Sequence, residues 1–451
     1  MALTGIQILK MLPKTNCGEC DIPTCLAFAM KVAAGQVEID QCPHVSDEAK
    51  QTIGEASAPP IRTIKMGIGD SAFTAGGETC LFRHEKRFEN PTGIAVMVST
   101  GEDTAAVDAK IDRFNKLEFE RVGVLMRADL IAVKDSDDNG DAFTALTKKV
   151  LDNAPKASVI LMTANVDNMK AAAAACGDRK PLLLGANADN WQAMGDLAKD
   201  VACPLGVQGK NLDDLVEVSG QLVEAGHKDM VIDTGARTLR AAFEDNVVAR
   251  RSAIKEKFKP LGLPTITFPC EMTDDLMMEA MIASVLMAKY TGIVVLSDIQ
   301  GEILFPLLLE QLNIFTDPQR PMVVEEDIYP VGGPGEDSPV IITCNFSLTY
   351  FIVSGEIEGS KVPSWLLIKD TEGLSVLTAW AAGKFGADLI AVFVNKSGIA
   401  DKVKHRELII PGYLATIKGE LEEELPDWTI TIGPREAGHL PAFLKEWKPA
   451  K

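Results

Sequence analysis

Eight short apolar runs recur between residues 93 and 320, and they constrain the fold more than any other feature of the chain. Each run has the length of a buried strand, and helical stretches separate consecutive runs. Strands that alternate with helices predict right-handed βαβ units and a parallel sheet. Eight units favour a closed (β/α)8 TIM barrel over an open doubly wound sheet. The runs are 94–99, 130–134, 159–164, 181–186, 204–209, 230–235, 265–270 and 293–298.

The alternation of strands and helices resumes near the C-terminus with fewer strands. Residues 316–339 are rich in proline, glycine and acidic residues, so we expect a linker there. Five apolar runs follow it and predict a small α/β domain of Rossmann-like or flavodoxin-like type. Such sheets bind ligands at the carboxyl ends of their strands. The five runs are 340–345, 365–370, 388–395, 407–412 and 428–433.

Four of the nine cysteines lie within the first 42 residues, in the spacing C-x2-C-x4-C-x16-C-P. No apolar core of comparable size in this segment justifies burying four thiols, so the pattern indicates a metal. Zinc sites usually present two short-spaced pairs, whereas a proline after the last cysteine is typical of bacterial ferredoxins. The pattern therefore favours a [4Fe–4S] cluster, with zinc as the alternative. The ligands would be Cys17, Cys20, Cys25 and Cys42.

The residues around this motif predict a helix and two connecting segments. Thr24 as N-cap begins a helix with Cys25 in its first turn, where backbone amides stabilise negative charge. The polar stretch 46–60 predicts a flexible tether, and strands at 63–68 and 79–82 predict a hairpin. The expected parts are an iron–sulfur module at 1–57, a linker and hairpin at 58–92, the barrel at 93–320 and the C-terminal domain at 321–451.

Charge and missing motifs exclude several classes of protein. The chain of 451 residues has 64 acidic and 45 basic residues, a net charge of −19, which argues against nucleic acid and anionic membranes as partners. It has no apolar run long enough for a membrane span and no signal-peptide pattern, so we expect a cytoplasmic protein. Nucleotide-binding glycine motifs and H-E-x-x-H are also missing, which disfavours NAD, ATP and a zinc protease.

Polar residues end several of the predicted barrel strands. In a barrel enzyme these positions would be catalytic candidates. Neither a histidine–carboxylate metal set nor a catalytic lysine accompanies them, so loop anchors or a docking face remain equally open. The residues are Asn165, Asn187, Gln208, Asp233, Glu271 and Asp298.

Four loops of the C-terminal domain are candidate binding loops. They follow four predicted parallel strands, so they leave the same edge of the sheet. Their glycines, hydroxyls and backbone amides are able to hold a large polar ligand. The candidates are Thr343 and Asn345, then Thr371, Glu372, Gly373, Leu374 and Ser375, then Gly412 and Tyr413, then Pro434, Arg435, Glu436, Ala437 and Gly438.

The order of parts is similar to a known family. With the segments MLPKTNCGECDIPTCLAFA and TEGLSVLTAW, the whole chain resembles the large (gamma) subunits of corrinoid iron–sulfur proteins. Those proteins act in the reductive acetyl-CoA (Wood–Ljungdahl) pathway of anaerobes. The resemblance implies a [4Fe–4S] cluster on the four N-terminal cysteines and a cobamide in the C-terminal domain. It matches the loops at Thr343, Asn345, 371–375 and 434–438 to cobamide-holding regions.

The resemblance also implies a methyl carrier whose reactive centre is the cobalt, with no catalytic side chain. The cobalt would take a methyl group from methyltetrahydrofolate through a separate methyltransferase and deliver it to acetyl-CoA synthase. A barrel-fold small subunit would form a heterodimer and cover the corrinoid. The cluster, supplied by a reductive activator or ferredoxin, would restore Co(I) from Co(II).

The cobamide is expected to be base-off, with no protein axial ligand, because the sequence has no D-x-H-x-x-G motif. Withholding a nitrogen donor makes Co(I) easier to reach. Two other functions stay open. The barrel itself could be a pterin-binding methyltransferase that uses Asn165, Asn187 and Asp233, or the chain could be a low-potential electron carrier.

Overall fold

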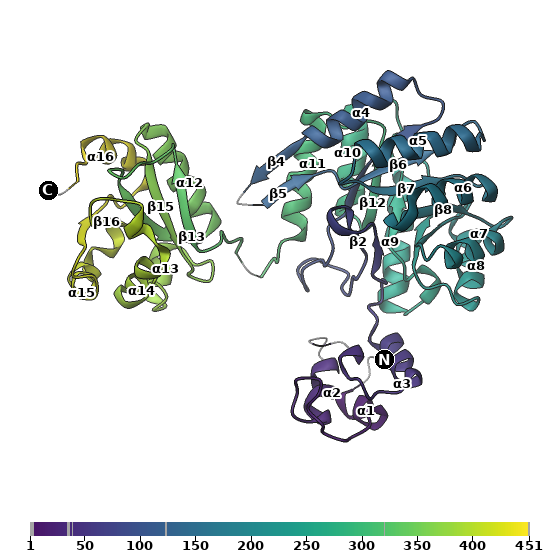
Figure 1. Cartoon of the computed structure of the whole chain (residues 1–451), viewed down its shortest axis with the longest axis horizontal. Coiled ribbons are helices and arrows are strands. Elements are labelled where there is room, and N and C mark those ends of the chain that lie inside the picture. The colour runs from purple at the N-terminus through teal and green to yellow at the C-terminus, as the bar shows by residue number, and fades with distance from the viewer. Residues whose placement is uncertain (1–3, 34–36, 38, 122–123, 320, 450–451) are drawn as a thin grey trace. The chain divides into compact units, whose positions relative to one another are not determined.

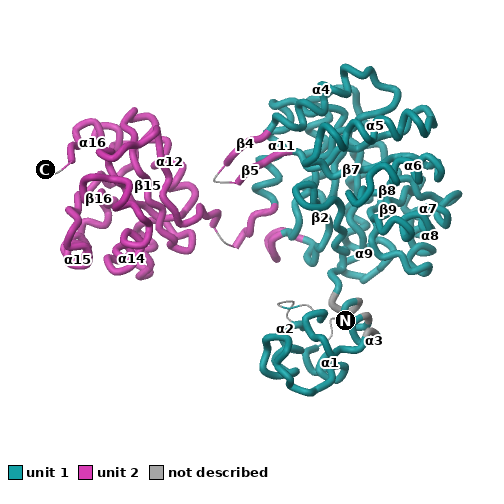
Figure 2. Tube along the Cα trace, viewed as in Figure 1, with its two compact units in different colours: residues 1–81, 88–117, 128–314 teal, residues 82–87, 118–127, 315–451 magenta. Residues whose placement is uncertain are grey.

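The computed structural model describes residues 4–33, 37, 39–121, 124–319 and 321–449. The chain divides into two compact units (Figure 2). The first comprises residues 1–81, 88–117 and 128–314, and the second comprises 82–87, 118–127 and 315–451. In the helices built from described residues, none combines the length and apolar character that crossing a bilayer requires.

The first unit contains a closed parallel barrel of eight strands, which confirms the (β/α)8 prediction. Its strand order is β10-β11-β12-β3-β6-β7-β8-β9. Side chains such as Ile160, Leu184 and Val231 fill the interior as one apolar core. The strands are β3 (Gly93–Ser99), β6 (Leu130–Lys134), β7 (Ser158–Met162), β8 (Leu182–Ala186), β9 (Leu205–Gln208), β10 (Met230–Asp233), β11 (Thr265–Thr267) and β12 (Thr291–Leu296).

Helices surround these strands (Figure 1). Side chains that follow the strands cap several helices, because the first backbone amides of a helix lack intrahelical acceptors. Asn165 is one of these caps and accepts from the amides of Asp167 and Asn168. The helices are α4 (Thr104–Lys116), α5 (Gly140–Asn153), α6 (Val166–Cys176), α7 (Trp191–Asp200), α8 (Leu212–Glu224), α9 (Leu239–Lys255), α10 (Leu276–Ala288) and α11 (Gly301–Phe315).

Two separate two-stranded sheets are short hairpins. The predicted hairpin exists, but β1 (Ile64–Met66) pairs with β2 (Phe73–Ala75), so the strand expected at 79–82 is wrong. Buried Arg250 donates to the Cys80 carbonyl and pairs with Glu78, which holds this segment as a loop. The second hairpin, which was not predicted, is formed by β4 (Glu118–Arg121) and β5 (Val124–Arg127).

The N-terminal module is helical. It contains α1 (Gly5–Met11), α2 (Cys25–Ala33) and α3 (Asp47–Ser57). The tether expected at 46–60 is therefore wrong, because α3 occupies most of it. Ser46 caps this helix, and Ala49 and Ile53, one helical turn apart, are buried in the module's core. Those two apolar side chains are enough to dock an otherwise polar helix.

The second unit contains a five-stranded sheet in the order β13-β15-β14-β16-β17. Neighbouring residues of a strand face opposite sides, so Ile341 and Ile342 belong to different apolar cores. Helices cover both cores, so this α/β domain has three layers. The strands are β13 (Asp327–Val331), β14 (Val340–Cys344), β15 (Ser364–Lys369), β16 (Glu407–Ile410) and β17 (Thr429–Ile432), and the helices are α12 (Ser347–Ser360), α13 (Val376–Ala381), α14 (Ala387–Ser397), α15 (Lys418–Glu424) and α16 (Leu440–Glu446).

Two predictions for this sheet are wrong. The run 388–395 is helix α14, whose buried Ile390, Ala391 and Val394 have helical spacing. Exposed Leu389 and Val392 make the run uniformly apolar, which is why it resembles a buried strand. The fifth strand is instead β13, which lies in the expected linker and pairs antiparallel with β15.

Candidate cofactor sites

The four candidate loops of the C-terminal domain leave one edge of the sheet, as predicted. Strands β14, β15, β16 and β17 are mutually parallel, so their carboxyl ends lie on the same side. Thr343 is buried within β14, and Asn345 follows the end of that strand. The predicted residues extend from Thr343 to Gly438 in the sequence, and they follow strands that end at this one edge.

Asn345 joins the first two loops. Its side chain is 4 % exposed, and its Oδ1 accepts from the Thr371 amide (3.0 Å), the Thr371 hydroxyl (2.9 Å) and the Gly373 amide (3.0 Å). Its Nδ2 donates to Asp370 Oδ1 at 2.8 Å. One amide side chain thus uses both of its ends to fix the loop after β15.

The loop after β15 has a sharply bent backbone. Glu372 and Gly373 both have positive φ, +56° and +76°. A side chain at Gly373 would lie 2.8 Å from Val323 Cγ1, so this position requires glycine. Leu374 packs against the core of the sheet, and Ser375 is the N-cap of α13. The bend leaves Glu372 exposed at the edge, where it pairs with Lys384.

The other two loops contact each other. The Gly412 amide donates to the Pro434 carbonyl (3.1 Å), and the Tyr413 hydroxyl donates to Glu436 Oε1 (2.8 Å). The hydrogen bond to Glu436 raises the pKa of Tyr413. A Cβ at Gly412 would lie 2.6 Å from the Gly433 carbonyl oxygen. Close backbone approach therefore holds these loops together. Of the remaining predicted residues, Ala437 packs against the core, whereas Arg435 and Gly438 are exposed.

Large apolar side chains are exposed on elements that follow these strand ends. Leu377 and Trp380 of α13 are 50 % and 39 % exposed, and Tyr413 after β16 is 42 % exposed. Exposed apolar groups next to polar loops are typical of a site for a large ligand with apolar and polar parts. The exposed apolar and polar groups at this edge therefore fit a corrinoid.

The two histidines of this domain lie in different places. His405 precedes β16, at the amino end of the strand and away from the candidate loops. Both of its ring nitrogens are engaged: Nε2 contacts the Ser338 carbonyl (2.9 Å), and Nδ1 accepts from the Glu407 amide (3.2 Å). His439 is exposed and follows the loop after β17.

The cysteine motif lies in the N-terminal module as predicted. Thr24 Oγ1 accepts from the Ala27 amide (3.1 Å) at the start of α2, and Cys25 is in the first turn. The Cys25 amide donates to Asn16 Oδ1 at 2.8 Å. The expectation that this segment has no apolar core is wrong, because Cys25 and Cys42 belong to one. Cys20 packs against it, and Cys17 is exposed.

The loop before α2 fits a negatively charged cluster. Four of its residues have positive φ: Lys14, Asn16, Gly18 and Asp21. Left-handed residues between right-handed ones aim backbone amides into a concavity that binds anions, including iron–sulfur clusters. Four thiols with such a loop form a suitable donor set for [4Fe–4S].

Zinc was the alternative metal predicted for this motif. Tetrahedral zinc with bonds of about 2.3 Å requires its sulfurs to lie about 3.8 Å apart. Among the described residues, the one group of metal-ligating atoms within 4.8 Å of each other is Cys17, Glu19 and His44, all exposed. It holds only one of the four motif cysteines.

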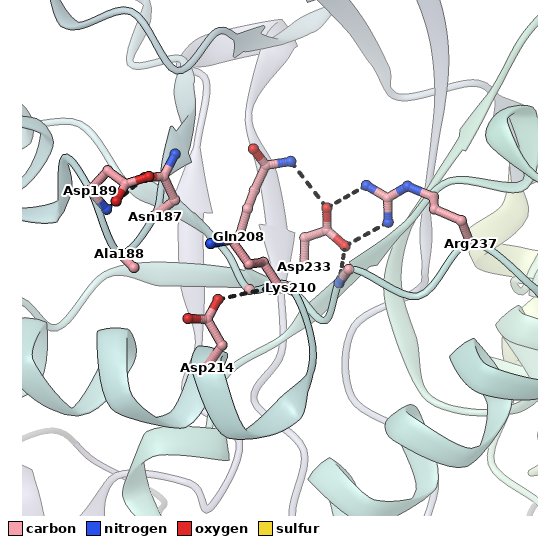
Figure 3. Close-up of a pocket in the computed structure, with 10 residues that line it drawn as sticks. Asn187, Ala188, Asp189, Gln208, Lys210, Asp214, Asp233 and Arg237 are labelled. Atoms are coloured by element: carbon pink, nitrogen blue, oxygen red, sulfur yellow. Dashed lines mark hydrogen bonds and ion pairs between the residues drawn. The ribbon is translucent and has the colours of Figure 1, made fainter.

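The barrel strand ends form a second cluster. A pocket of about 350 Å³ is lined by Asn187, Gln208 and Asp233, together with Lys210 and Arg237 (Figure 3). Three of the predicted residues thus lie together. Asp298 is instead paired with Arg113 (2.7 Å), and Asn165 is a helix cap.

Two cations in this cluster were missed by the sequence analysis. Arg237 binds Asp233 through two hydrogen bonds, and it also binds Glu271. Lys134 donates to the other oxygen of Glu271 at 2.7 Å. Burial raises the pKa of Glu271, but Lys134 and Arg237 outweigh it and hold that pKa below its usual value. Lys134 ends the run LIAVK, so its position at a strand end was a usable signal.

Comparisons with known proteins identify the family. A family model described as "CO dehydrogenase/acetyl-CoA synthase delta subunit" matches residues 63–444, and a model described as "Putative Fe-S cluster" matches residues 12–44. A "Corrinoid/iron-sulfur protein large subunit" from Moorella thermoacetica is 44 % identical over 445 residues, covering 99 % of each chain. The chain belongs to the corrinoid/iron–sulfur protein large-subunit family.

A more distant relative covers the chain equally well. The "Acetyl-CoA decarbonylase/synthase complex subunit gamma" of Methanopyrus kandleri is 32 % identical over 456 residues, covering 98 % of each chain. Among solved structures, 7,8-dihydropteroate synthase from Vibrio fischeri ES114 aligns with a TM-score of 0.39 at 12 % identity, covering 56 % of this chain and 99 % of that one. The iron–sulfur model spans all four cysteines of the motif in this chain.

Proposed function

We propose that the chain is a methyl carrier that holds a cobamide at the carboxyl edge of β14–β17 and a [4Fe–4S] cluster on Cys17, Cys20, Cys25 and Cys42. The observation that carries this proposal is the convergence of four loops at one sheet edge, where Asn345 and Gly412 tie them in pairs. Family membership and the cysteine motif support it independently.

Different residues at this edge would contact the polar and the apolar parts of a cobamide. Exposed polar residues of 371–375 and 434–438, such as Glu372 and Arg435, suit its polar side groups, and exposed Leu377, Trp380 and Tyr413 suit its apolar parts. When bound, the cobamide supplies a cobalt that carries a methyl group from methyltetrahydrofolate, by way of a separate methyltransferase, to acetyl-CoA synthase. The cluster supplies an electron that returns the cobalt to its reactive state.

We further propose that the protein gives the cobalt no axial ligand. His405 lies at the opposite edge of the sheet with both ring nitrogens engaged. His439 lies on the candidate side, but the described contacts give it no carboxylate to fix its tautomer, as metal-bound imidazoles usually have. The Co(II) spectrum should show cobalt hyperfine lines without nitrogen splitting. Nitrogen triplets that vanish in His439→Ala would contradict this proposal.

The partners follow from the same proposal. The related protein is named a large subunit, so we expect a barrel-fold small subunit that forms a heterodimer and covers the corrinoid. Exposed Leu377 and Trp380 offer apolar surface for such a cover. The methyltransferase, acetyl-CoA synthase and a reductive activator or ferredoxin would be transient partners in the cytoplasm.

Paired glycine variants test the cobamide site. In Gly412→Ala the new Cβ would lie 2.6 Å from the Gly433 carbonyl oxygen and 2.8 Å from the Arg435 amide, so the two loops must separate. We expect at least a tenfold loss of corrinoid affinity with iron content unchanged. Gly419→Ala in α15 is the control, because a Cβ there meets no atom within 4 Å.

Absorption spectra of anaerobically reconstituted protein give the readout, because corrin and iron–sulfur bands differ. Equal corrinoid affinity in the two glycine variants would place the site elsewhere. A full chain that binds iron but no corrinoid would favour the electron carrier.

A further inference from the structure

The Arg237 guanidinium at the mouth of the barrel is bound on its edge by carboxylates and on its face by an aromatic ring. Arg237 lies in the irregular loop 234–238 between β10 and α9, not on a strand or helix. Its Nη1 and Nη2 donate to the two oxygens of Asp233, at 3.0 and 2.8 Å. Its Nε donates to Glu271 Oε2 at 2.5 Å, and its guanidinium carbon lies 4.7 Å from the ring centroid of Phe268.

These groups form a complete recognition site for a planar guanidinium. A carboxylate that accepts two parallel hydrogen bonds matches the edge of a guanidinium, and an aromatic ring matches its face. The site is also anchored from behind. Gln208 Nε2 and the Gly235 amide donate to Asp233, and Lys134 pairs with Glu271. Each carboxylate therefore has other partners besides Arg237.

The site has a route to solvent. The Asp233 side chain is only 2 % exposed, whereas that of Arg237 is 32 % exposed. Both residues line the pocket of about 350 Å³, beside Asn187, Gln208 and Lys210 (Figure 3). Arg237 thus lines a cavity that has room for the rest of a ligand.

We propose that the barrel mouth is a binding site for ligands with an amidine edge, either an acyclic guanidinium or a cyclic guanidine such as a 2-aminopyrimidin-4-one ring, and that Arg237 of the same chain fills this site. Such rings present two adjacent N–H donors in the arrangement that Asp233 accepts from Arg237. A ligand binds here only when Arg237 is displaced or removed. The inference is independent of the cobamide proposal, because it concerns barrel residues alone.

The test uses the full-length chain and its Arg237→Ala variant. Isothermal titration calorimetry measures the binding of methylguanidinium and of 2-aminopyrimidin-4-one. We expect one ligand per chain and at least tenfold tighter binding to Arg237→Ala than to the wild type. Arg240→Ala is the matched control, since Arg240 lies in the first turn of the adjacent helix, pairs with Glu244 and is 86 % exposed. Its titration should match the wild type.

Two further controls identify the chemistry. Tetramethylammonium has the same charge as methylguanidinium but no N–H donors, so it should not bind. The double variant Asp233→Asn/Arg237→Ala removes the accepting carboxylate and should lose the binding gained in Arg237→Ala. Tight binding that persists in the double variant would overturn the assignment to Asp233.

Other outcomes are equally decisive. A folded Arg237→Ala variant that binds neither probe would overturn the proposal, as would equally tight binding by the wild type. If Arg237→Ala does not fold, its soluble yield on refolding becomes the measurement. Recovery in methylguanidinium but not in tetramethylammonium would support the site, and equal yields would refute it.

Discussion

Replacing Asn345 by alanine tests how the candidate cobamide loops are held. In the wild type, Asn345 Oδ1 accepts three hydrogen bonds, from the Thr371 amide, the Thr371 hydroxyl and the Gly373 amide. Alanine removes all of them and also the donor to Asp370. Both loop residues are buried, so their donors do not gain water freely in exchange.

The expected magnitude follows from those contacts. A buried hydrogen bond contributes about 1 kcal/mol net, so three of them contribute about 3 kcal/mol to holding the loop. Since 1.4 kcal/mol is a factor of ten, the loop should open about 100-fold more readily. We therefore expect hydrogen exchange of the Thr371 and Gly373 amides to accelerate about 100-fold and corrinoid affinity to fall with it.

Hydrogen–deuterium exchange of the full chain measures the loop directly. Asn395→Ala is the matched control, because it makes the same substitution at an exposed position of α14 in the same unit. Exchange at β17 should stay unchanged in both variants. An acceleration below about fivefold at Thr371 and Gly373, or one equal to that of Asn395→Ala, would show that Asn345 does not hold this loop and would refute the hydrogen-bond energies assumed above.

Three other perturbations have defined outcomes. Cys20→Ala should lose iron, sulfide and the reduced-cluster EPR signal, whereas Cys203→Ala outside the motif should keep them. Ser46→Ala removes the cap of α3 at a cost of about 1 kcal/mol, so protease cleavage within α3 should be about fivefold faster; an unchanged rate would contradict the capping role. Burial raises the pKa of Glu279 despite its hydrogen bonds from Ser297. The stability that protonated Glu279 contributes to the folded state is therefore present below its unfolded pKa and lost as pH rises through its raised folded pKa. Glu279→Gln should flatten this decline in stability with pH, measured by calorimetry.

The barrel was predictable because its signal is repetitive. Eight runs of matching length, each buried on both faces, leave few alternatives once helices separate them. The sequence pattern of the C-terminal sheet is weaker, because a single apolar helix or a single edge strand changes the number of strands that it predicts. Helix α14 exposes Leu389 and Val392, and β13 has only Val331 fully buried, so local pattern favoured the wrong assignment for both.

The location of the candidate cobamide site was predictable for a topological reason. Parallel strands share a carboxyl edge, so loops after them meet whatever their sequences are. The role of Asn345 was not predictable, because its partners lie 26 and 28 positions away and depend on the order of the strands. Arg237 was missed because it lies within a loop, four residues after the strand-end Asp233.

The barrel and the C-terminal sheet use their carboxyl edges differently. At the barrel mouth, Asp233 and Glu271 are matched by Arg237 and Lys134, and Asp298 is matched by Arg113, so these carboxylates are already neutralised by the chain. A general acid or base needs a charge that is not held this way. At the C-terminal edge, hydrogen bonds instead join loop to loop, and apolar Leu377 and Trp380 remain exposed. That difference favours the C-terminal edge as the place that holds a reactive cofactor. The barrel would serve as a scaffold, and its mouth would bind a ligand only when Arg237 is displaced.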